Sequence, residues 1–152
     1  MREQGDFRLS WLGLQSRLHV SLYKLTSGRV GGSVFGAPVL LLSSAGRRTG
    51  RKRTTPLLYI EDEDNLVVVA SNGGREKNPA WFMNIKQDPR TEVQIRGRRT
   101  VMRAEQANRD EKQRLWPLLT KMYGRYDGYQ ARTKREIPVV ILYHDRPSTR
   151  ES

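Results

Sequence analysis

The clearest candidates for chemistry are the cations between Gly46 and Arg53. Five of these eight residues are arginine or lysine, with glycine and threonine between them. A turn of this composition exposes backbone N–H groups and gathers guanidinium groups that bind phosphate or carboxylate through paired hydrogen bonds. The spacing is not that of a Walker loop. A solvated basic hairpin tip and a nucleic-acid patch stay open as alternatives, although no aromatic residue lies among these cations.

Two further polar segments follow along the chain. Residues 70–74 end a run of valines in a glycine-rich loop, where a backbone can approach a ligand closely. Asn78 and Pro79 then predict the start of a helix, with Asn78 as its N-cap and Pro79 at the first helical position. The free N–H groups of a helix start attract anions. The plainer alternatives are a connecting loop and a helix whose Trp81 and Phe82 anchor the core.

Three tyrosines, Tyr123, Tyr126 and Tyr129, recur at a spacing of three residues. If the segment is helical, their side chains lie on one face. Such phenol groups either border a bound substrate, where they stack and donate hydrogen bonds, or pack into the core. The spacing alone leaves both interpretations open.

The composition removes several classes of chemistry. The 152 residues include no cysteine, which excludes disulfides and thiolate chemistry, and only His19 and His144, so we expect no metal site. No Gly-x-Ser-x-Gly elbow is present. Demanding chemistry is therefore expected of an organic cofactor. The net charge of +12 attracts polyanions in general.

Short apolar runs predict strands over residues 39–44, 53–60, 66–70, 91–95, 100–104 and 137–143, with a hairpin tip at 61–65. A helix is predicted from Asn78 to near Asp88, and a second from Asn108, where Glu111 completes a capping box and Pro117 introduces a kink. Several short strands with few helices predict a mainly β barrel with peripheral helices (α+β).

The chain divides into three parts by its pattern. Residues 1–27 are predicted to form an amphipathic helix that packs on the barrel or lies on an anionic membrane surface. Residues 28–145 form the barrel domain, and residues 146–152 a disordered tail. No run approaches the roughly 20 apolar residues of a membrane span, and no secretory signal is recognised, so we expect a cytoplasmic protein with peripheral membrane contact left open.

Taken together, the motifs resemble the deazaflavin-dependent nitroreductase family of actinobacteria, within the flavin/deazaflavin oxidoreductase superfamily. The likeness covers residues 28–143 and includes Tyr126 and Tyr129. The matching motifs are GAP (36–38), LLL (40–42), GRRTG (46–50), RTTPL (53–57), VVASNGG (68–74), NPAWFMN (78–84), VQ (93–94), WP (116–117), MY (122–123) and IPVV (137–140).

The resemblance implies a split β-barrel of the FMN-binding, pyridoxamine-phosphate-oxidase-like kind. It also implies coenzyme F-420, an 8-hydroxy-5-deazaflavin with a phosphate and a glutamate tail, which gives the positive charge an anionic partner. The implied reaction transfers a hydride from the reduced deazaflavin to a small electron-poor substrate: a quinone, a nitroaromatic or an unsaturated lactone. An FMN-dependent reductase and a non-enzymatic deazaflavin carrier are the alternatives, and a nucleic-acid partner is not expected. The oligomeric state stays open.

The resemblance also assigns residues. Tyr123, Tyr126 and Tyr129 border the substrate, and Tyr126 is the catalytic candidate because its hydroxyl can donate to developing negative charge. The phosphate and tail would be held by Arg47, Arg48, Thr49 and Arg53. The remaining cofactor residues implied are Thr54, Thr55, Pro56, Leu57, Leu58, Val69, Ala70, Ser71, Asn72, Ala80, Trp81, Phe82, Met83 and Asn84. Asn72 is a departure, because the nitroreductase itself has lysine there and the change removes a charge near the cofactor.

Overall fold

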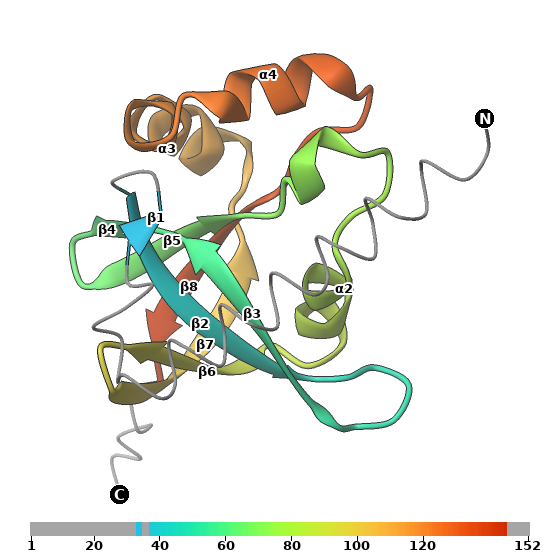
Figure 1. Cartoon of the computed structure of the whole chain (residues 1–152), viewed down its shortest axis with the longest axis vertical. Helices are drawn as coiled ribbons and strands as arrows, with labels where there is room; N and C mark the ends of the chain where they lie inside the picture. Colours follow the sequence, from blue (N-terminus) through green and yellow to red (C-terminus); the bar gives the residue numbers. More distant parts are fainter. Residues whose placement is uncertain (1–32, 35–36, 146–152) are drawn as a thin grey trace, which may run out of the picture.

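Antiparallel strands are the main regular structure in this computed structural model, which describes residues 33–34 and 37–145 (Figure 1). The sheet order is β1-β2-β6-β7-β8-β5-β4, and β3 pairs with β2 outside this path. The strands are β1 (Ser33–Val34), β2 (Ala37–Ala45), β3 (Lys52–Leu58), β4 (Ile60–Asp62), β5 (Asn65–Val69), β6 (Arg90–Ile95), β7 (Arg98–Gln106) and β8 (Val139–His144).

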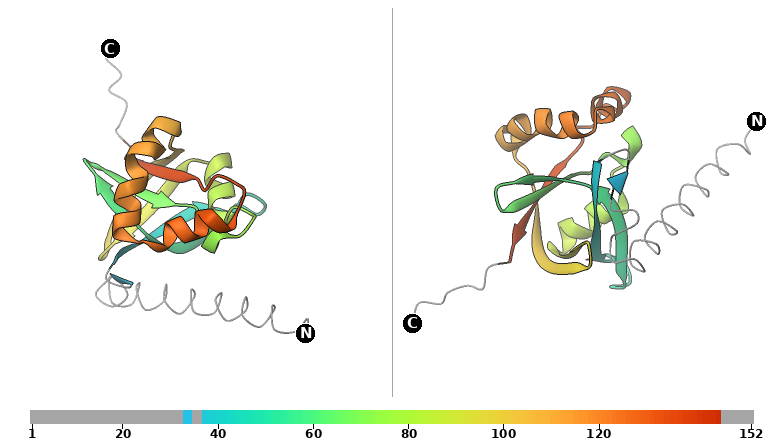
Figure 2. Two further views of the ribbon diagram at one scale, coloured as in Figure 1. Left: turned by 90° about the horizontal axis from the view of Figure 1, so that it is seen from above. Right: turned by 60° about the vertical axis from the view of Figure 1, so that its left-hand side comes forward.

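Within residues 33–34 and 37–145, four short helical segments accompany the sheet. They are the 3-10 turn η1 (Asn72–Gly74) and the helices α2 (Ala80–Gln87), α3 (Arg109–Met122) and α4 (Arg125–Arg132). Helices α3 and α4 lie together at one end of the barrel, and α2 lies apart from them (Figures 1 and 2). This mainly β architecture confirms the predicted fold class.

The second predicted strand, over residues 53–60, is two strands in the structure. Strand β3 pairs with β2, whereas β4 pairs with β5, so the chain changes partner at Tyr59. Among the described strands, β3 pairs only with β2. This edge position explains why Pro56, which lacks an N–H, is tolerated within it.

Two apolar clusters hold the described residues together. The first fills the barrel and includes the α2 side chains Trp81, Phe82 and Ile85. The second lies between the outer face of β5 and β8 and the helices α3 and α4. Strands β5 and β8 supply side chains to both clusters, because successive residues of a strand point to opposite faces. Helix α2 therefore packs into the first cluster, and the helices near the three tyrosines pack onto the second.

The two helix starts differ from each other. At α3 the predicted capping box is confirmed: Glu111 N–H donates to Asn108 Oδ1 at 2.8 Å, and Asn108 N–H donates to Glu111 Oε1 at 3.0 Å. At α2 the prediction was wrong, because Pro79 is the N-cap residue and no side chain caps the helix. The side chain of Asn78 is engaged instead by Arg135, whose guanidinium donates to Asn78 Oδ1 at 2.8 Å.

The predicted helix over residues 1–27 and the tail from 146 lie outside the described residues, and so does the proposed membrane contact. In the range the structure describes, no helix is long and apolar enough to cross a membrane.

Candidate functional site

The cationic segment forms the tip of the β2–β3 hairpin. Gly46 N–H donates to Arg51 O at 2.8 Å, and Gly50 N–H donates to Gly46 O at 2.7 Å. Gly50 has φ +71°, a left-handed conformation that glycine adopts without steric strain. Thr49 Oγ1 also accepts from Arg51 N–H at 3.3 Å. These bonds make the tip a closed turn that presents its arginines from a defined backbone.

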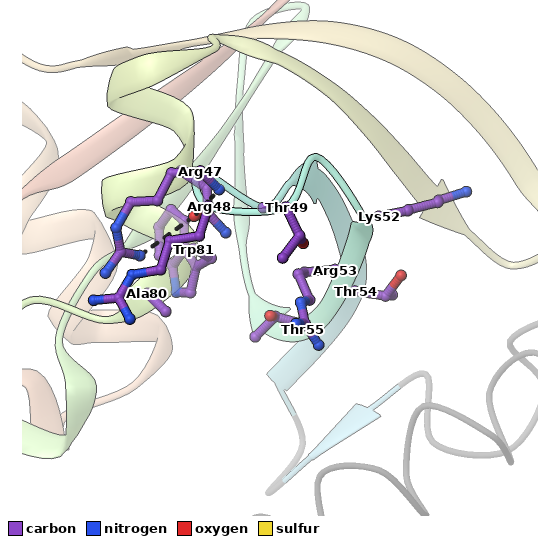
Figure 3. A pocket seen from close by; sticks show the side chains of 11 residues that line it. Arg47, Arg48, Thr49, Lys52, Arg53, Thr54, Thr55, Ala80 and Trp81 are labelled. Carbon is purple, nitrogen blue, oxygen red and sulfur yellow. Dashed lines mark hydrogen bonds between the residues drawn. The ribbon is translucent and has the colours of Figure 1, made fainter.

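The hairpin tip and the start of α2 enclose a cleft of ≈ 690 Å³ (Figure 3). Four of its eleven lining residues are cationic and none is acidic. The lining residues are Gly46, Arg47, Arg48, Thr49, Lys52, Arg53, Thr54, Thr55, Ala80, Trp81 and Asn84. A cleft lined by one sign of charge concentrates ligands of the opposite sign.

Alternation along β3 separates two kinds of cation. Lys52 and Thr54 point away from Arg47 and Arg48 (Figure 3). The Lys52 ammonium pairs with Glu92 Oε1 at 3.0 Å, and the Thr54 hydroxyl bonds to the Ser43 hydroxyl. Within the part of the chain that the structure describes, the side chains of Arg48 and Arg53 have no hydrogen bond or ion pair. Their guanidinium groups are therefore available to an anionic ligand.

Asn84 joins the hairpin to α2. Its buried Oδ1 accepts from the backbone N–H of Arg47 at 3.1 Å and from the Arg47 guanidinium at 3.4 Å. The first N–H groups of α2 lie close by, since Ala80 and Trp81 line the cleft and no side chain caps the helix. Uncapped N–H groups and the positive end of the helix dipole both favour an anion there.

The structure brings together nine of the predicted cofactor residues in this cleft, and it adds Gly46 and Lys52. The others lie elsewhere. The Phe82 side chain is in the barrel core, Val69 packs in the cluster beneath α3 and α4, and Met83 is among the exposed apolar side chains. The remaining predicted residues outside the lining are Pro56, Leu57, Leu58, Ala70, Ser71 and Asn72.

The three tyrosines form one aromatic group that is separate from the cleft lining. Tyr123 follows the end of α3, whereas Tyr126 and Tyr129 are on α4, so they do not share a single helix. The Tyr123 and Tyr129 hydroxyls are 3.1 Å apart, and both side chains are half-buried. Tyr126 is only 4% exposed, and its ring packs edge-on against Tyr123 and Tyr129.

Burial determines the protonation of Tyr126. Loss of solvent raises the pKa of its hydroxyl far above the ordinary value of 10.0, and the neighbouring Tyr123 and Tyr129 raise the pKa further. At neutral pH the group is a neutral phenol inside an apolar cluster. This location differs from the substrate-facing position predicted for it, and its catalytic role stays a prediction.

The loop after β5 connects the two regions. Its turn η1 packs against α4, and a Cβ at Gly74 would lie 2.7 Å from the Tyr129 carbonyl oxygen. Gly74 also has φ +80°. A larger residue at this position would therefore push the loop and α4 apart.

Comparison with known proteins agrees with this geometry. The sequence model of the F-420H(2)-dependent quinone reductase family matches residues 15–144. The F-420H(2)-dependent quinone reductase Rv1261c of Mycobacterium tuberculosis is 40% identical over 130 residues, which cover 83% of this chain and 87% of that protein.

Two solved structures support the fold. The F-420-H2 dependent reductase FDR-A is 34% identical with a TM-score of 0.64, and the match covers 69% of this chain and 93% of FDR-A. A Listeria innocua structure assigned as a pyridoxamine 5′-phosphate oxidase has a TM-score of 0.51 at 13% identity, over 71% of this chain and 84% of that one, and shows the fold alone. The split barrel and the deazaflavin-dependent relationship predicted from the motifs are confirmed, and the chain belongs to the F-420H(2)-dependent quinone reductase family.

Proposed function

We propose that this chain is an oxidoreductase that binds reduced coenzyme F-420 and delivers its hydride to a small quinone. The observation that carries the proposal is the acid-free cationic cleft between the hairpin tip and the start of α2. We infer the class of cofactor from the family to which the chain belongs, and the quinone substrate from relatives that are described as quinone reductases. Nitroaromatic and unsaturated-lactone substrates remain secondary proposals.

The residues of the cleft fit the anionic part of the coenzyme. A phosphate and a glutamate tail need several cationic or N–H donors and no nearby carboxylate. Arg48 and Arg53 offer guanidinium groups with no protein partner in the described range, and Arg47 is oriented by Asn84. Charge-assisted paired hydrogen bonds from arginine are the strongest contacts available to such groups. We assign the phosphate and tail to this set, together with Thr49.

The bound reduced deazaflavin supplies the hydride, so the protein needs no redox-active side chain. The protein's own role is to hold the hydride donor and the acceptor in the geometry of the reaction, which by itself lowers the activation barrier substantially. The arginines fix the charged end, and the α2 start with Trp81 forms a wall of the cleft. Tyr123 and Tyr129, which are less buried than Tyr126, are our proposed hydrogen-bond donors to a quinone oxygen.

A binding titration followed by turnover tests the proposal. The purified full chain is titrated with coenzyme F-420 and, separately, with FMN, and the change in cofactor absorbance or fluorescence is recorded. We expect saturable binding of F-420, and oxidation of its reduced form when a water-soluble benzoquinone is added. Preference for FMN would favour the flavin-dependent alternative. Tight F-420 binding without turnover of any quinone would instead identify a carrier.

The same preparation addresses the remaining alternatives. Rates with a nitroimidazole and an unsaturated lactone, measured beside the quinone, rank the three substrate classes. A gel shift with duplex DNA at low and high salt tests nucleic-acid binding, which weakens steeply with salt where it exists.

A further inference from the structure

Arg135 lies in the stretch between α4 and β8, far in sequence from the cleft. Its guanidinium donates to four oxygens of the segment 70–78. Nε donates to Arg75 O at 2.8 Å and Nη2 to Ser71 O at 2.8 Å. Nη1 donates to Asn78 Oδ1 at 2.8 Å and to Ala70 O at 3.4 Å. One planar group therefore ties the end of β5, the loop and the approach to α2. The planar fork of arginine holds such oxygens in one plane, which a lysine ammonium does not do.

All four acceptors are uncharged. No carboxylate is hydrogen-bonded to Arg135 among the described residues, and loss of solvent lowers the pKa of its guanidinium from the ordinary value. Arginine nevertheless stays protonated at all physiological pH values. A half-buried cation held by carbonyl groups leaves its positive charge uncompensated behind the loop.

The bonds to Ala70 and Ser71 orient two successive peptide groups. In a trans peptide the C=O and the following N–H point in opposite directions, and no cis peptide occurs among the residues that the structure describes. Because the carbonyls of Ala70 and Ser71 face Arg135, the N–H groups of Ser71 and Asn72 face away from it. Neither N–H has a hydrogen-bond partner in the part of the chain described. Asn72 has φ +46°, a left-handed conformation that asparagine adopts more readily than most residues.

The bond to Asn78 acts on the other end of the segment. Asn78 lies two residues before Ala80, which begins α2 and lines the cleft. The same guanidinium therefore links the oriented loop to the uncapped helix start. Without the Arg135 guanidinium, the N–H groups of Ser71 and Asn72 and those at the start of α2 would no longer be held at a fixed distance from each other.

We propose that Arg135 is a positioning residue of the cofactor site. It holds residues 70–72 so that the N–H groups of Ser71 and Asn72 are offered to a hydrogen-bond acceptor on the deazaflavin ring, and it fixes the start of α2 beside the anionic tail. This inference rests on the proposed function, since the ring and tail are those of coenzyme F-420.

The test uses the full chain with Arg135→Lys, which keeps the charge, and Arg135→Gln, which keeps a planar donor. Lys134→Ala is the matched control, because Lys134 is an exposed neighbouring cation. The first readout is backbone hydrogen exchange over residues 70–80 without cofactor. We expect faster exchange in both Arg135 variants and no change in the control. Exchange equal to that of the unsubstituted chain in Arg135→Lys would overturn the positioning role.

The second readout is the affinity for coenzyme F-420 and the single-turnover oxidation rate at saturating cofactor, measured well below each variant's unfolding temperature. We expect the rate to fall on the order of 10- to 100-fold, as for a donor misplaced by a fraction of an ångström. A purely structural role would lower only the unfolding temperature, and that result would contradict the inference.

If the Arg135 variants unfold, Asn78→Ala provides the test, because it removes only one of the four hydrogen bonds. A normal oxidation rate together with normal hydrogen exchange in Asn78→Ala would also contradict the inference. If the unsubstituted chain fails to bind F-420, the proposed function falls, while the exchange measurement still decides whether Arg135 holds the loop.

Discussion

The hairpin cleft and the tyrosine group of α3 and α4 both contain many side chains capable of chemistry, but these side chains are exposed in the cleft and packed on one another in the tyrosine group. At the hairpin the polar groups are exposed, and Arg48 and Arg53 have no protein partner in the described range. At the helices the aromatic groups pack on one another, and Tyr126 is buried in the second apolar cluster. The first region exposes groups that suit an anionic ligand, whereas the second packs its aromatic rings mainly against one another.

This difference shows how far the type of a residue predicts whether its side chain binds a ligand or packs in the core. Clustered cations repel one another and are hydrated, so they stay at the surface unless an anion binds them. Tyrosine has a large apolar body with one polar atom, so it serves either as core or as lining. The loop around Gly74 joins the two regions, because it contacts the backbone of Tyr129 on one side and continues to α2 on the other.

The largest effect should come from removing the Tyr126 ring. Tyr126→Ala leaves a cavity among Tyr123, Tyr129 and the strand side chains, and we expect a loss of about 3–5 kcal/mol in the free energy of unfolding. Tyr126→Phe keeps the ring and should leave F-420 affinity and turnover nearly unchanged. Urea denaturation and single-turnover kinetics measure the two. A turnover loss of 10-fold or more in Tyr126→Phe, with stability retained, would break the comparison and restore the catalytic role predicted from the sequence.

The contact between the two regions gives the next largest effect. In Gly74→Ala the new methyl would meet the Tyr129 carbonyl, and the residue would keep a left-handed φ, so we expect a loss of roughly 2–4 kcal/mol in stability. Gly128→Ala is the control, because no atom lies within 4 Å of its Cβ. On helix α4 that change should be neutral or stabilising by about 0.5–1 kcal/mol. Equal unfolding temperatures of the two variants would mean that the loop can shift to accommodate the methyl group at no cost in stability.

Adjacent cations on β3 sharpen the comparison within the cleft itself. Arg53→Ala should weaken coenzyme F-420 binding by about 1.5–3 kcal/mol, the range for a hydrogen bond to a charged group. Lys52→Ala removes the same charge from another residue of the cleft lining, but its ammonium points away from Arg47 and Arg48 (Figure 3) and already pairs with Glu92. The change should therefore have a much smaller effect. The Arg53 effect should shrink as salt rises. Isothermal titration at two salt concentrations checks both variants, and equal losses would show that net charge alone attracts the cofactor.

The smallest predicted effect concerns alkaline pH. The pKa of Tyr126 is raised in the folded protein, so below pH 10 both folded and unfolded chains hold the proton and stability is intact. Above that pH the unfolded chain releases the proton while the folded chain retains it, and stability falls as pH rises. The loss from this group should be about 1 kcal/mol for the first pH unit. Denaturation of Tyr126→Phe over the same range should show a shallower decline, and identical slopes would mean that Tyr126 is more hydrated than its burial indicates.

Much of the fold was predictable because strand runs, the hairpin tip and the capping box at Asn108 depend on neighbouring residues. The cationic part of the site was predictable for the same reason, since its arginines are contiguous. The division of residues 53–60 into β3 and β4 was not, because it depends on which distant strand each half pairs with. The role of Asn78 was missed as well. Its local pattern is that of an N-cap, but a guanidinium 57 residues away competes for its side-chain oxygen.

The sequence by itself determined that strands dominate and that cations gather at one turn, because both depend on neighbouring residues. Its ordered series of short motifs carried the resemblance to a known family, and that resemblance implied the class of cofactor and the kind of barrel. Tertiary structure decided which side chains share a space. It paired Lys52 with Glu92 while leaving the Arg53 guanidinium without a protein partner in the described range. It also buried Tyr126 and placed Arg135 against the loop after β5. These outcomes follow from strand pairing and helix docking, in which residues far apart in the chain compete for the same volume and the same hydrogen-bond acceptors.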